Sequence, residues 1–212
     1  MKTIVICSGG LDSVSLAHMV AANRKLTGLV SFDYGQRHRK ELDYAALCAK
    51  RLDVPHDIID MRGIGAALTG SALTDDVDVP DGHYAEETMR VTVVPNRNAI
   101  MLTVAYGIAA ARGDQAVATA VHGGDHFIYP DCRPEYFTQM SQALNHGSKI
   151  WTEYQIPFRV ETPIIDKSKA DIVKMGLDLQ APLELTWSCY LGNATPCGSC
   201  DSCILRAKGF QE

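Results

Sequence analysis

Short apolar runs alternate along the chain with segments in which apolar side chains recur every three or four residues. The run at 3–7 is almost wholly apolar, which is typical of a strand buried on both faces of a sheet. Longer segments have the length and the period of helices. The pattern predicts strands at 3–7, 26–32, 56–59 and 116–121, and helices at 13–22, 40–52, 98–112, 134–144 and 167–175. This alternation favours an α/β fold, a Rossmann-like parallel sheet with helices on both faces.

A glycine-rich loop, Ser8-Gly9-Gly10-Leu11-Asp12-Ser13, follows the first predicted strand. Two adjacent glycines allow a tight turn that brings backbone N–H groups close to an anion. The helix predicted to follow has N-terminal amides and a dipole that favour phosphate. The sequence contains no Walker A pattern with its lysine. We therefore predict a pyrophosphate-binding loop, with an ordinary glycine-rich turn as the alternative.

Length and composition narrow the class of protein. The chain has 212 residues, 46% of them hydrophobic, which suits one domain, alone or with a small appendage. A formal net charge of −5 argues against the broad basic face that binds nucleic acid. No apolar run approaches the ~20 residues of a membrane-spanning helix, and the N-terminus has no signal-peptide pattern. We therefore expect a cytoplasmic protein with neither a membrane partner nor a direct nucleic-acid partner.

Four of the seven cysteines gather near the C-terminus, in the pattern Cys189-x7-Cys197-x2-Cys200-x2-Cys203. Two overlapping Cys-x-x-Cys steps with a fourth cysteine upstream suit tetrahedral coordination by thiolates. We predict one structural zinc ion, with an iron–sulfur cluster or a simple group of thiols as alternatives. The chain thus divides into an α/β domain at 1–180 and a C-terminal zinc-binding segment at 181–212 packed on it.

Polar residues gather where predicted strands give way to helices, which is the edge where ligands bind in parallel sheets. Asp33 and Asn98 also suit turns or helix caps, Arg97 and Arg133 suit surface ion pairs, and Cys132 suits packing in a core. The groups are Asp33-Tyr34-Gly35-Gln36-Arg37-His38 with Glu41, Pro95-Asn96-Arg97-Asn98, His122-Gly123-Gly124-Asp125-His126, Tyr129-Pro130-Asp131-Cys132-Arg133, and Asp166-Lys167-Ser168-Lys169.

Residues 69–87 differ from the rest of the chain. They are acidic, contain glycine and proline, and have little periodicity. Such a segment suits a long mobile loop that orders over the site, or equally a plain surface insertion.

In combination, these motifs resemble the 7-cyano-7-deazaguanine synthase family, from about residue 3 to Phe210. The Ser-Gly-Gly-x-Asp-Ser loop alone resembles only the PP-loop ATP pyrophosphatases, with their adenine nucleotide alpha-hydrolase-like fold. The segment from Tyr129 to Arg133 and the cysteine spacing narrow the resemblance to this family. One segment departs from it, because His122-Gly-Gly-Asp125 stands where many members carry Cys-Glu-Thr-Asp.

The resemblance implies an ATP-dependent carbon–nitrogen ligase of queuosine biosynthesis. Such an enzyme turns 7-carboxy-7-deazaguanine and ammonia into 7-cyano-7-deazaguanine by adenylating first the acid and then the amide. Mg²⁺ would bridge the phosphates of ATP, and family members are commonly homodimers. Since the sequence contains no glutaminase, free ammonia is the expected nitrogen donor.

The resemblance also suggests roles for individual residues. Those expected at ATP are Cys7, Ser8, Gly9, Gly10, Leu11, Asp12, Ser13, Phe32, Asp33 and Arg97. Those expected at the deazaguanine substrate are Tyr34, Gln36, Arg37, Asp125, Tyr129, Asp131 and Arg133. Those expected to act in catalysis are Asp12, Arg97, Asp125, Asp131, Arg133 and Lys167.

Two other functions stay open at this point. Another PP-loop enzyme, such as a tRNA thiolation enzyme, would share the phosphate loop, although the acidic balance and the four-cysteine spacing argue against it. A non-enzymatic zinc-ribbon module would bind nucleic acid or protein. Such a module would show no ATP turnover that depends on a small acid.

Overall fold

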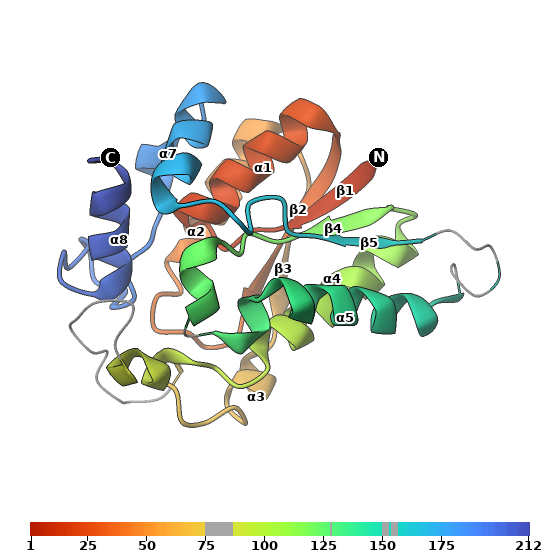
Figure 1. Cartoon of the computed structure of the whole chain (residues 1–212), viewed down its shortest axis with the longest axis horizontal. Coiled ribbons are helices and arrows are strands. Elements are labelled where there is room, and N and C mark those ends of the chain that lie inside the picture. Colours follow the sequence, from red (N-terminus) through yellow and green to blue (C-terminus); the bar gives the residue numbers. More distant parts are fainter. Residues whose placement is uncertain (75–86, 128, 150–152, 154–156) are drawn as a thin grey trace.

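One sheet organises the structure. In the residues that the computed structural model describes (1–74, 87–127, 129–149, 153 and 157–212), five parallel strands pair in the order β3-β2-β1-β4-β5 (Figure 1). The strands are β1 (Lys2–Ile6), β2 (Lys25–Asp33), β3 (His56–Asp60), β4 (Ala116–Ala118) and β5 (Arg159–Glu161). The strand order reverses between β1 and β4. This reversal is the point at which open parallel sheets bind ligands, beyond the carboxyl ends of the strands.

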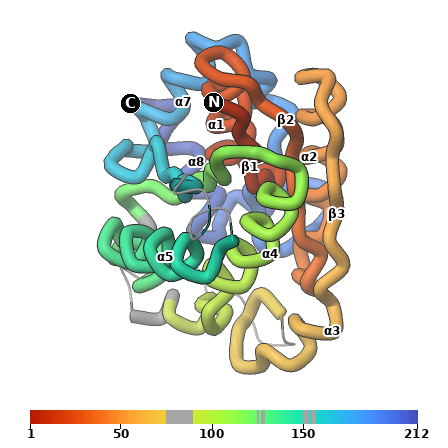
Figure 2. The backbone as a smooth tube through the Cα atoms, turned by 90° about the vertical axis from the view of Figure 1, so that its right-hand side faces the viewer, coloured from red at the N-terminus to blue at the C-terminus, as the bar shows by residue number. Residues whose placement is uncertain are grey.

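Helices cover both faces of this sheet, as the alternation of elements predicts. Helices α1 and α2 lie on one face and α4 and α5 on the other (Figure 1 and Figure 2). The helices are α1 (Leu11–Asn23), α2 (Glu41–Leu52), α3 (Arg62–Gly65), α4 (Arg97–Ala111), α5 (Pro134–His146), α7 (Lys169–Asp178) and α8 (Asp201–Gly209). Short 3₁₀ turns lie at Glu87–Thr92, Gly123–Phe127, Pro130–Cys132 and Leu183–Leu185.

Successive side chains of each central strand pack alternately into the two hydrophobic cores, one on each face of the sheet. Ile4 and Val30 pack in the core beneath α4 and α5, whereas their neighbours Val5 and Leu29 pack beneath α1 and α2. All four side chains are fully buried. The period of two sends alternate side chains to opposite faces, so a strand covered on both faces must be apolar throughout. This explains the unbroken apolar run at 3–7.

Several element boundaries differ from the sequence prediction, and the differences bear on the site. Helix α1 begins at Leu11 rather than at 13, so Asp12 lies in its first turn. Helix α7 begins at Lys169 rather than at 167, because the side chain of Ser168 accepts the N–H of Asp171 in a capping box. Strand β4 ends at Ala118 rather than at 121. The sequence prediction missed β5, α3 and α8, each of nine residues or fewer.

The C-terminal segment packs against the rest of the fold. The N–H of Trp187 donates to the carbonyl oxygen of Gly9 at 2.9 Å, which ties the segment to the glycine-rich loop. The Lys40 ammonium lies 4.4 Å from the centroid of the Trp187 ring and donates to the carbonyl oxygen of Ala194 at 2.9 Å. Helix α8 also contacts α7. The expected division near residue 180 stays a prediction.

The acidic segment at 69–87 falls largely outside the described residues, which omit 75–86. Of its described part, Ser71 and Leu73 are buried. The carbonyl oxygen of Leu73 accepts the N–H of Arg37 at 3.2 Å. None of the described helices combines the length and the apolarity that crossing a membrane requires.

Candidate active site

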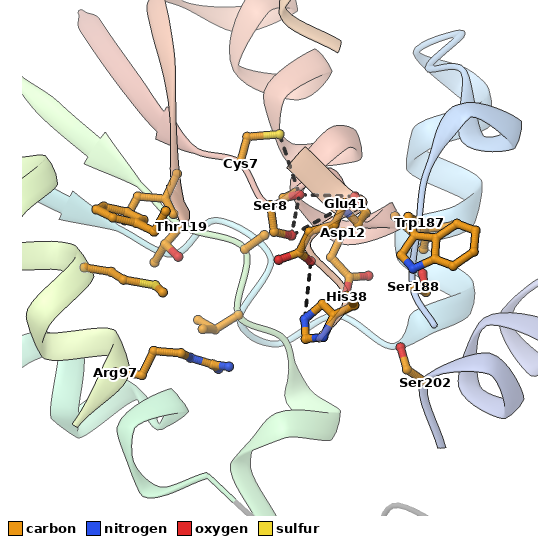
Figure 3. A pocket seen from close by; sticks show the side chains of 18 of the residues that line it. Cys7, Ser8, Asp12, His38, Glu41, Arg97, Thr119, Trp187, Ser188 and Ser202 are labelled. Carbon is orange, nitrogen blue, oxygen red and sulfur yellow. Dashed lines mark hydrogen bonds and ion pairs between the residues drawn. The ribbon is translucent and has the colours of Figure 1, made fainter. Parts of the chain in front are cut away.

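A cavity of about 240 Å³ lies at the carboxyl end of the sheet, where the strand order reverses. The glycine-rich loop after β1 forms part of its wall, together with the ends of β2 and β4 and the start of α4. The C-terminal segment forms another part. Figure 3 shows Arg97 on one side, Trp187 and Ser188 on the other, and Asp12, His38 and Glu41 between them.

The glycine-rich loop turns tightly against α2. Gly9 has φ +89°, and a Cβ atom there would lie 2.1 Å from the carbonyl oxygen of Glu41, so only glycine fits. The Ser8 hydroxyl accepts the N–H of Gly10 at 3.3 Å, and the Ser13 hydroxyl donates to the Gly10 carbonyl at 3.1 Å. The N-cap of α1 is Gly10, which has no side chain to cap the helix. The loop and the start of α1 therefore form an arrangement that suits an anion.

A lysine, a carboxylate and a histidine meet beside this loop. Lys169 Nζ lies 2.7 Å from both carboxylate oxygens of Asp12 and 3.0 Å from Nε2 of His122. The other ring nitrogen of His122, Nδ1, accepts the N–H of Gly124 at 3.0 Å. Burial opposes ionisation of Asp12, but the positive charge of Lys169 and its hydrogen bonds, with a contribution from His122, outweigh it and hold the pKa of this carboxyl below its usual value. Asp12 is therefore ionised at neutral pH.

A partly buried arginine lies across the cavity from this group. Arg97 begins α4, and its charge acts on the nearby Tyr34, Tyr129, Cys132 and Asp131. Within the described part of the chain, no carboxylate forms an ion pair with it. Burial raises the pKa of the Tyr34 hydroxyl to about 12, so this phenol stays neutral. Because Arg97 lines the cavity and pairs with no carboxylate among the described residues, its guanidinium suits an anionic ligand.

Ten of the residues expected at ATP or at the substrate lie in the cavity wall. These are Cys7, Ser8, Gly10, Leu11, Asp12, Ser13, Phe32, Tyr34, Arg97 and Tyr129. The hydroxyl of Tyr129 shares a hydrogen bond of 2.6 Å with that of Thr92, which fixes its position.

Other expected residues make contacts within the fold. The carboxylate of Asp33 accepts from Arg39 Nε at 2.7 Å, and that of Asp131 accepts the N–H of Asn98 at the start of α4. Gln36 is buried and donates to the Phe32 carbonyl. In this structure Asp33, Gln36 and Asp131 therefore stabilise the loops and the helix start around the site.

The remaining expected residues lie at the edge of the site or beyond what is described. Arg133 is exposed, and its Nε donates to the carbonyl oxygen of His126 at 3.1 Å. The carbonyl oxygen of Lys167 accepts the N–H of Gly123, and the cavity wall formed by described residues includes Lys169 rather than Lys167. Arg37 is partly buried. The side chain of Asp125 lies outside the described part of the structure.

The sequence assigns no role to eight residues of the wall, although it places His38, Glu41 and Lys169 at the binding edge. Arg206 is held in place because its guanidinium donates to Thr186 Oγ1 and to the carbonyl oxygen of Leu183, both at 2.6 Å. Only their position after folding marks the five that lie in the C-terminal segment, since no strand or phosphate loop directly precedes them. The eight are His38, Glu41, Lys169, Trp187, Ser188, Tyr190, Ser202 and Arg206.

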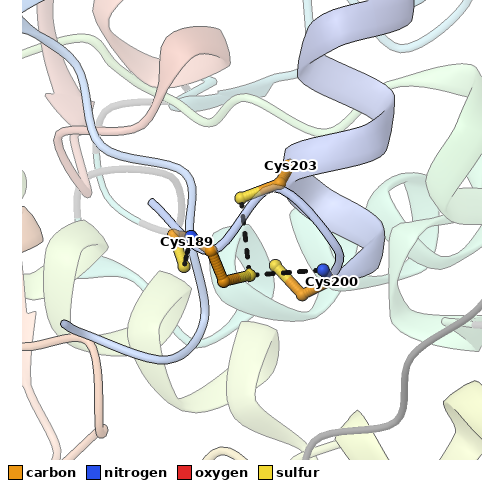
Figure 4. Close-up of side chains that lie close together, drawn as sticks. Cys189, Cys200 and Cys203 are labelled. Carbon is orange, nitrogen blue, oxygen red and sulfur yellow. Dashed lines mark hydrogen bonds between the residues drawn. The ribbon is translucent and has the colours of Figure 1, made fainter. Parts of the chain in front are cut away.

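The four C-terminal cysteines lie together at the start of α8 (Figure 4). Their Sγ atoms all fall within 4.8 Å of one another, and those of Cys197 and Cys203 are 3.9 Å apart. Four thiolates around one zinc ion, with Zn–S bonds of about 2.3 Å, would place neighbouring sulfurs about 3.8 Å apart. The donor set and its spacing therefore fit one tetrahedral metal ion. The segment that carries them also supplies part of the cavity wall.

Known proteins resemble this chain along nearly its whole length. The family described as queuosine biosynthesis protein QueC matches residues 2–212. A 7-cyano-7-deazaguanine synthase from Paracoccus denitrificans (strain Pd 1222) is 66% identical over 213 residues, covering 99% of this chain and 88% of its own. One from Rhizobium meliloti (strain 1021) is 63% identical over 210 residues, covering 99% and 87%.

Solved structures share the fold at low sequence identity. An NMN synthetase from Francisella tularensis has a TM-score of 0.52 and 12% identity, covering 92% of this chain and 70% of its own. An NH3-dependent NAD synthetase from Campylobacter jejuni has a TM-score of 0.50 and 15% identity, covering 87% and 66%. These similarities support the predicted α/β fold, and no more than the fold.

Proposed function

We propose that this chain, which belongs to the queuosine biosynthesis protein QueC family of 7-cyano-7-deazaguanine synthases, makes 7-cyano-7-deazaguanine from 7-carboxy-7-deazaguanine, ammonia and ATP. The observation that carries the proposal for this site is the cavity itself. It joins a loop suited to pyrophosphate, an arginine that pairs with no carboxylate in the described part of the chain, and a lysine paired with Asp12. The named relatives favour this function over tRNA thiolation and over a binding module.

The chemistry requires activation of a carboxylate, which is a poor electrophile because its leaving group would be oxide. A carboxylate oxygen of the substrate attacks the α-phosphate of ATP. Pyrophosphate leaves, and the acid remains bound as an acyl adenylate. Backbone amides of the loop from Ser8 to Ser13, together with the start of α1, would stabilise the negative charge on this leaving group. Lys169, beside Asp12, would stabilise the charge that develops on the α-phosphate.

The substrate acid would enter on the opposite side of the cavity. Arg97 would bind its carboxylate, because guanidinium groups hold carboxylates in a bidentate fashion. Tyr34 and Tyr129 would line the deazaguanine ring. Ammonia then displaces AMP to give the amide. A second ATP then adenylates the oxygen of the amide. AMP leaves and carries this oxygen with it, which gives the nitrile.

Two metal ions belong to this proposal. Zn²⁺ bound by Cys189, Cys197, Cys200 and Cys203 would hold the C-terminal segment in place and leave no position for a substrate. Mg²⁺ would neutralise the phosphates of ATP, and Asp12, whose side chain is 24% exposed, offers it an ionised carboxylate beside the loop. A homodimer and free ammonia as nitrogen donor complete the proposal.

The test is a reaction of the purified chain with 7-carboxy-7-deazaguanine, ATP, Mg²⁺ and ammonium, followed by mass spectrometry of base and nucleotide products. The proposal predicts the nitrile, with AMP and pyrophosphate and with the amide appearing first. Pyrophosphate release that does not depend on this acid would point to another substrate. No cleavage of ATP by the zinc-loaded protein would overturn the proposal.

A further inference from the structure

The carboxyl group of Glu41 lies in the cavity wall next to the glycine-rich loop. Glu41 begins α2 and is 8% exposed. Gln36 Nε2 donates to one of its oxygens, Oε1, at 3.1 Å, and the other oxygen, Oε2, lies 3.7 Å from Nε2 of His38. A buried carboxylate normally requires a cation or several hydrogen bonds. Lysine and arginine side chains in the described part of the chain make no ion pair with it.

The neighbours of Glu41 do not supply that cation. Burial, together with the charge of Arg97, lowers the pKa of His38 to about 4, so its ring is neutral at pH 7. Burial raises the pKa of Glu41 itself to about 8, whereas Gln36 and Arg97 act in the opposite direction and Cys7 adds to the rise. Glu41 therefore exchanges its proton near neutral pH, and Oε2 is left for a small cationic ligand.

We propose that Glu41 binds the ammonium ion and accepts its proton, which makes it the base that supplies ammonia to the activated acid. This inference rests on the proposed function. Ammonium suits the site because it is small, carries one positive charge and donates hydrogen bonds in four directions. The place also suits the task, since the backbone of Glu41 packs directly against Gly9 of the loop expected to hold the phosphates.

The proton balance of the step is complete without another reactant. Ammonium gives one proton to the Glu41 carboxylate and becomes ammonia. The nitrogen lone pair attacks the carbonyl carbon of the acyl adenylate, and the bond from carbon to the bridging oxygen breaks, with its electron pair leaving on AMP. The new amide nitrogen loses one further proton to solvent, and Glu41 releases the first before the next cycle. One acyl adenylate and one ammonium thus yield one amide, one AMP and two protons.

The variant Glu41→Gln tests the inference because the two chemical steps can be measured separately. Glutamine keeps the shape of the side chain and an oxygen for Gln36, but accepts no proton. Acid-dependent exchange of labelled pyrophosphate into ATP, without ammonium, measures adenylation. Formation of the amide at pH 7.5 measures transfer to ammonia. In Glu41→Gln we expect the rate of pyrophosphate exchange to stay within about threefold of that of the unchanged protein. The rate of amide formation should fall about 30-fold or more.

The matched control is Asp114→Asn, which changes a buried carboxyl outside the cavity wall and should leave both steps unchanged. The pH profile gives a second measure. With Glu41→Gln, amide formation should rise about tenfold per pH unit, following free ammonia, whereas the unchanged protein should level off above pH 8.

The outcomes separate the two proposals. Equal amide formation and equal pH profiles in the variant and the unchanged protein would overturn the role of Glu41. Loss of pyrophosphate exchange together with amide formation would also overturn it, because Glu41 would then serve adenylation or folding. Absence of acid-dependent exchange in the unchanged protein would instead overturn the proposed function itself.

Discussion

At the scale of single residues, the charged groups of the cavity fall into two kinds. Asp12 is neutralised within the protein, since Lys169 holds both of its oxygens at 2.7 Å. Arg97, which is partly buried, and Glu41, which is buried, have no such partner among the described residues, although both line the cavity. Ionisable groups that the fold leaves without a partner in a cavity are candidates for binding a ligand of opposite charge. We therefore propose separate places in the cavity for an acid and for a small cation.

The pair formed by Lys169 and Asp12 leads to a first prediction. Lys169→Met should lower the kcat/KM of nitrile formation by about 10²-fold, because it removes a positive charge from the reacting phosphate. Lys174→Met, on the exposed face of the same helix, is the control and should change it by less than about threefold. Steady-state kinetics with the acid as varied substrate provide the measurement. Equal effects of the two variants would contradict the assignment.

Glu41 leads to a prediction about stability and pH. Its pKa is raised from 4.5 to about 8 in the folded state, so the folded protein binds this proton more tightly than the unfolded chain. The contribution to stability is therefore present below pH 4.5 and is lost as the pH rises to 8. Glu41→Gln should gain stability relative to the unchanged protein over this range, by up to about 5 kcal/mol. Urea unfolding at pH 5 and at pH 8.5 measures the difference, and a gap that does not change with pH would refute it.

At the scale of elements, the turn between β1 and α1 depends on one glycine. Gly9→Ala places a Cβ against the backbone of α2 at a positive φ and should lower the free energy of unfolding by roughly 2–4 kcal/mol. Gly107→Ala is the matched control, because that position is exposed in α4 with no atom within 4 Å of the new Cβ. It should stabilise the protein by about 0.5–1 kcal/mol. Thermal unfolding of both variants is the test, and a harmless Gly9→Ala would show that the loop has another conformation.

The C-terminal segment connects metal binding to the cavity. Cys200→Ser removes one of the four thiols and should abolish stoichiometric zinc, lower the melting temperature by roughly 5–10 °C and lower activity more than about tenfold. The reason is that the same segment carries Trp187, Ser188 and Arg206 into the cavity wall. Thr195→Ala, exposed in the same segment, is the control. Full activity of metal-free Cys200→Ser would show that the segment does not shape the site.

At the scale of the whole molecule, the sequence predicts four of the five strands described. The reason is that the apolar run or the helical period that identifies an element is formed by residues close together in the sequence. The apolar run of β1 and the helical period of α2 and α4 each identify one element, and the loop after β1 marks the binding edge. The cysteine cluster is also confirmed, since four thiols at this spacing can converge without help from the rest of the fold. These features depend on neighbours in sequence.

The missed features depend instead on contacts distant in sequence. Lys169 reaches Asp12 across 157 positions of the chain, and Trp187 meets Gly9 through a backbone hydrogen bond. One local pattern, Ser-x-x-Asp at 168–171, separates Lys169 from Lys167, but the sequence prediction begins this helix at 167. Only the capping box at Ser168 sets where α7 begins, and therefore which of the two lysines faces the cavity. The three residues of β5 are too few to show a period.

The central claim is that one cavity activates the carboxylate by attack of its oxygen on the α-phosphate of ATP. The most direct measurement uses 7-carboxy-7-deazaguanine with ¹⁸O in both carboxylate oxygens, turned over with ammonium and followed by mass spectrometry of every phosphate product. The account predicts two molecules of AMP for each nitrile, each carrying one ¹⁸O, and unlabelled pyrophosphate. Label in pyrophosphate or in inorganic phosphate, or unlabelled AMP beside the nitrile, would contradict it.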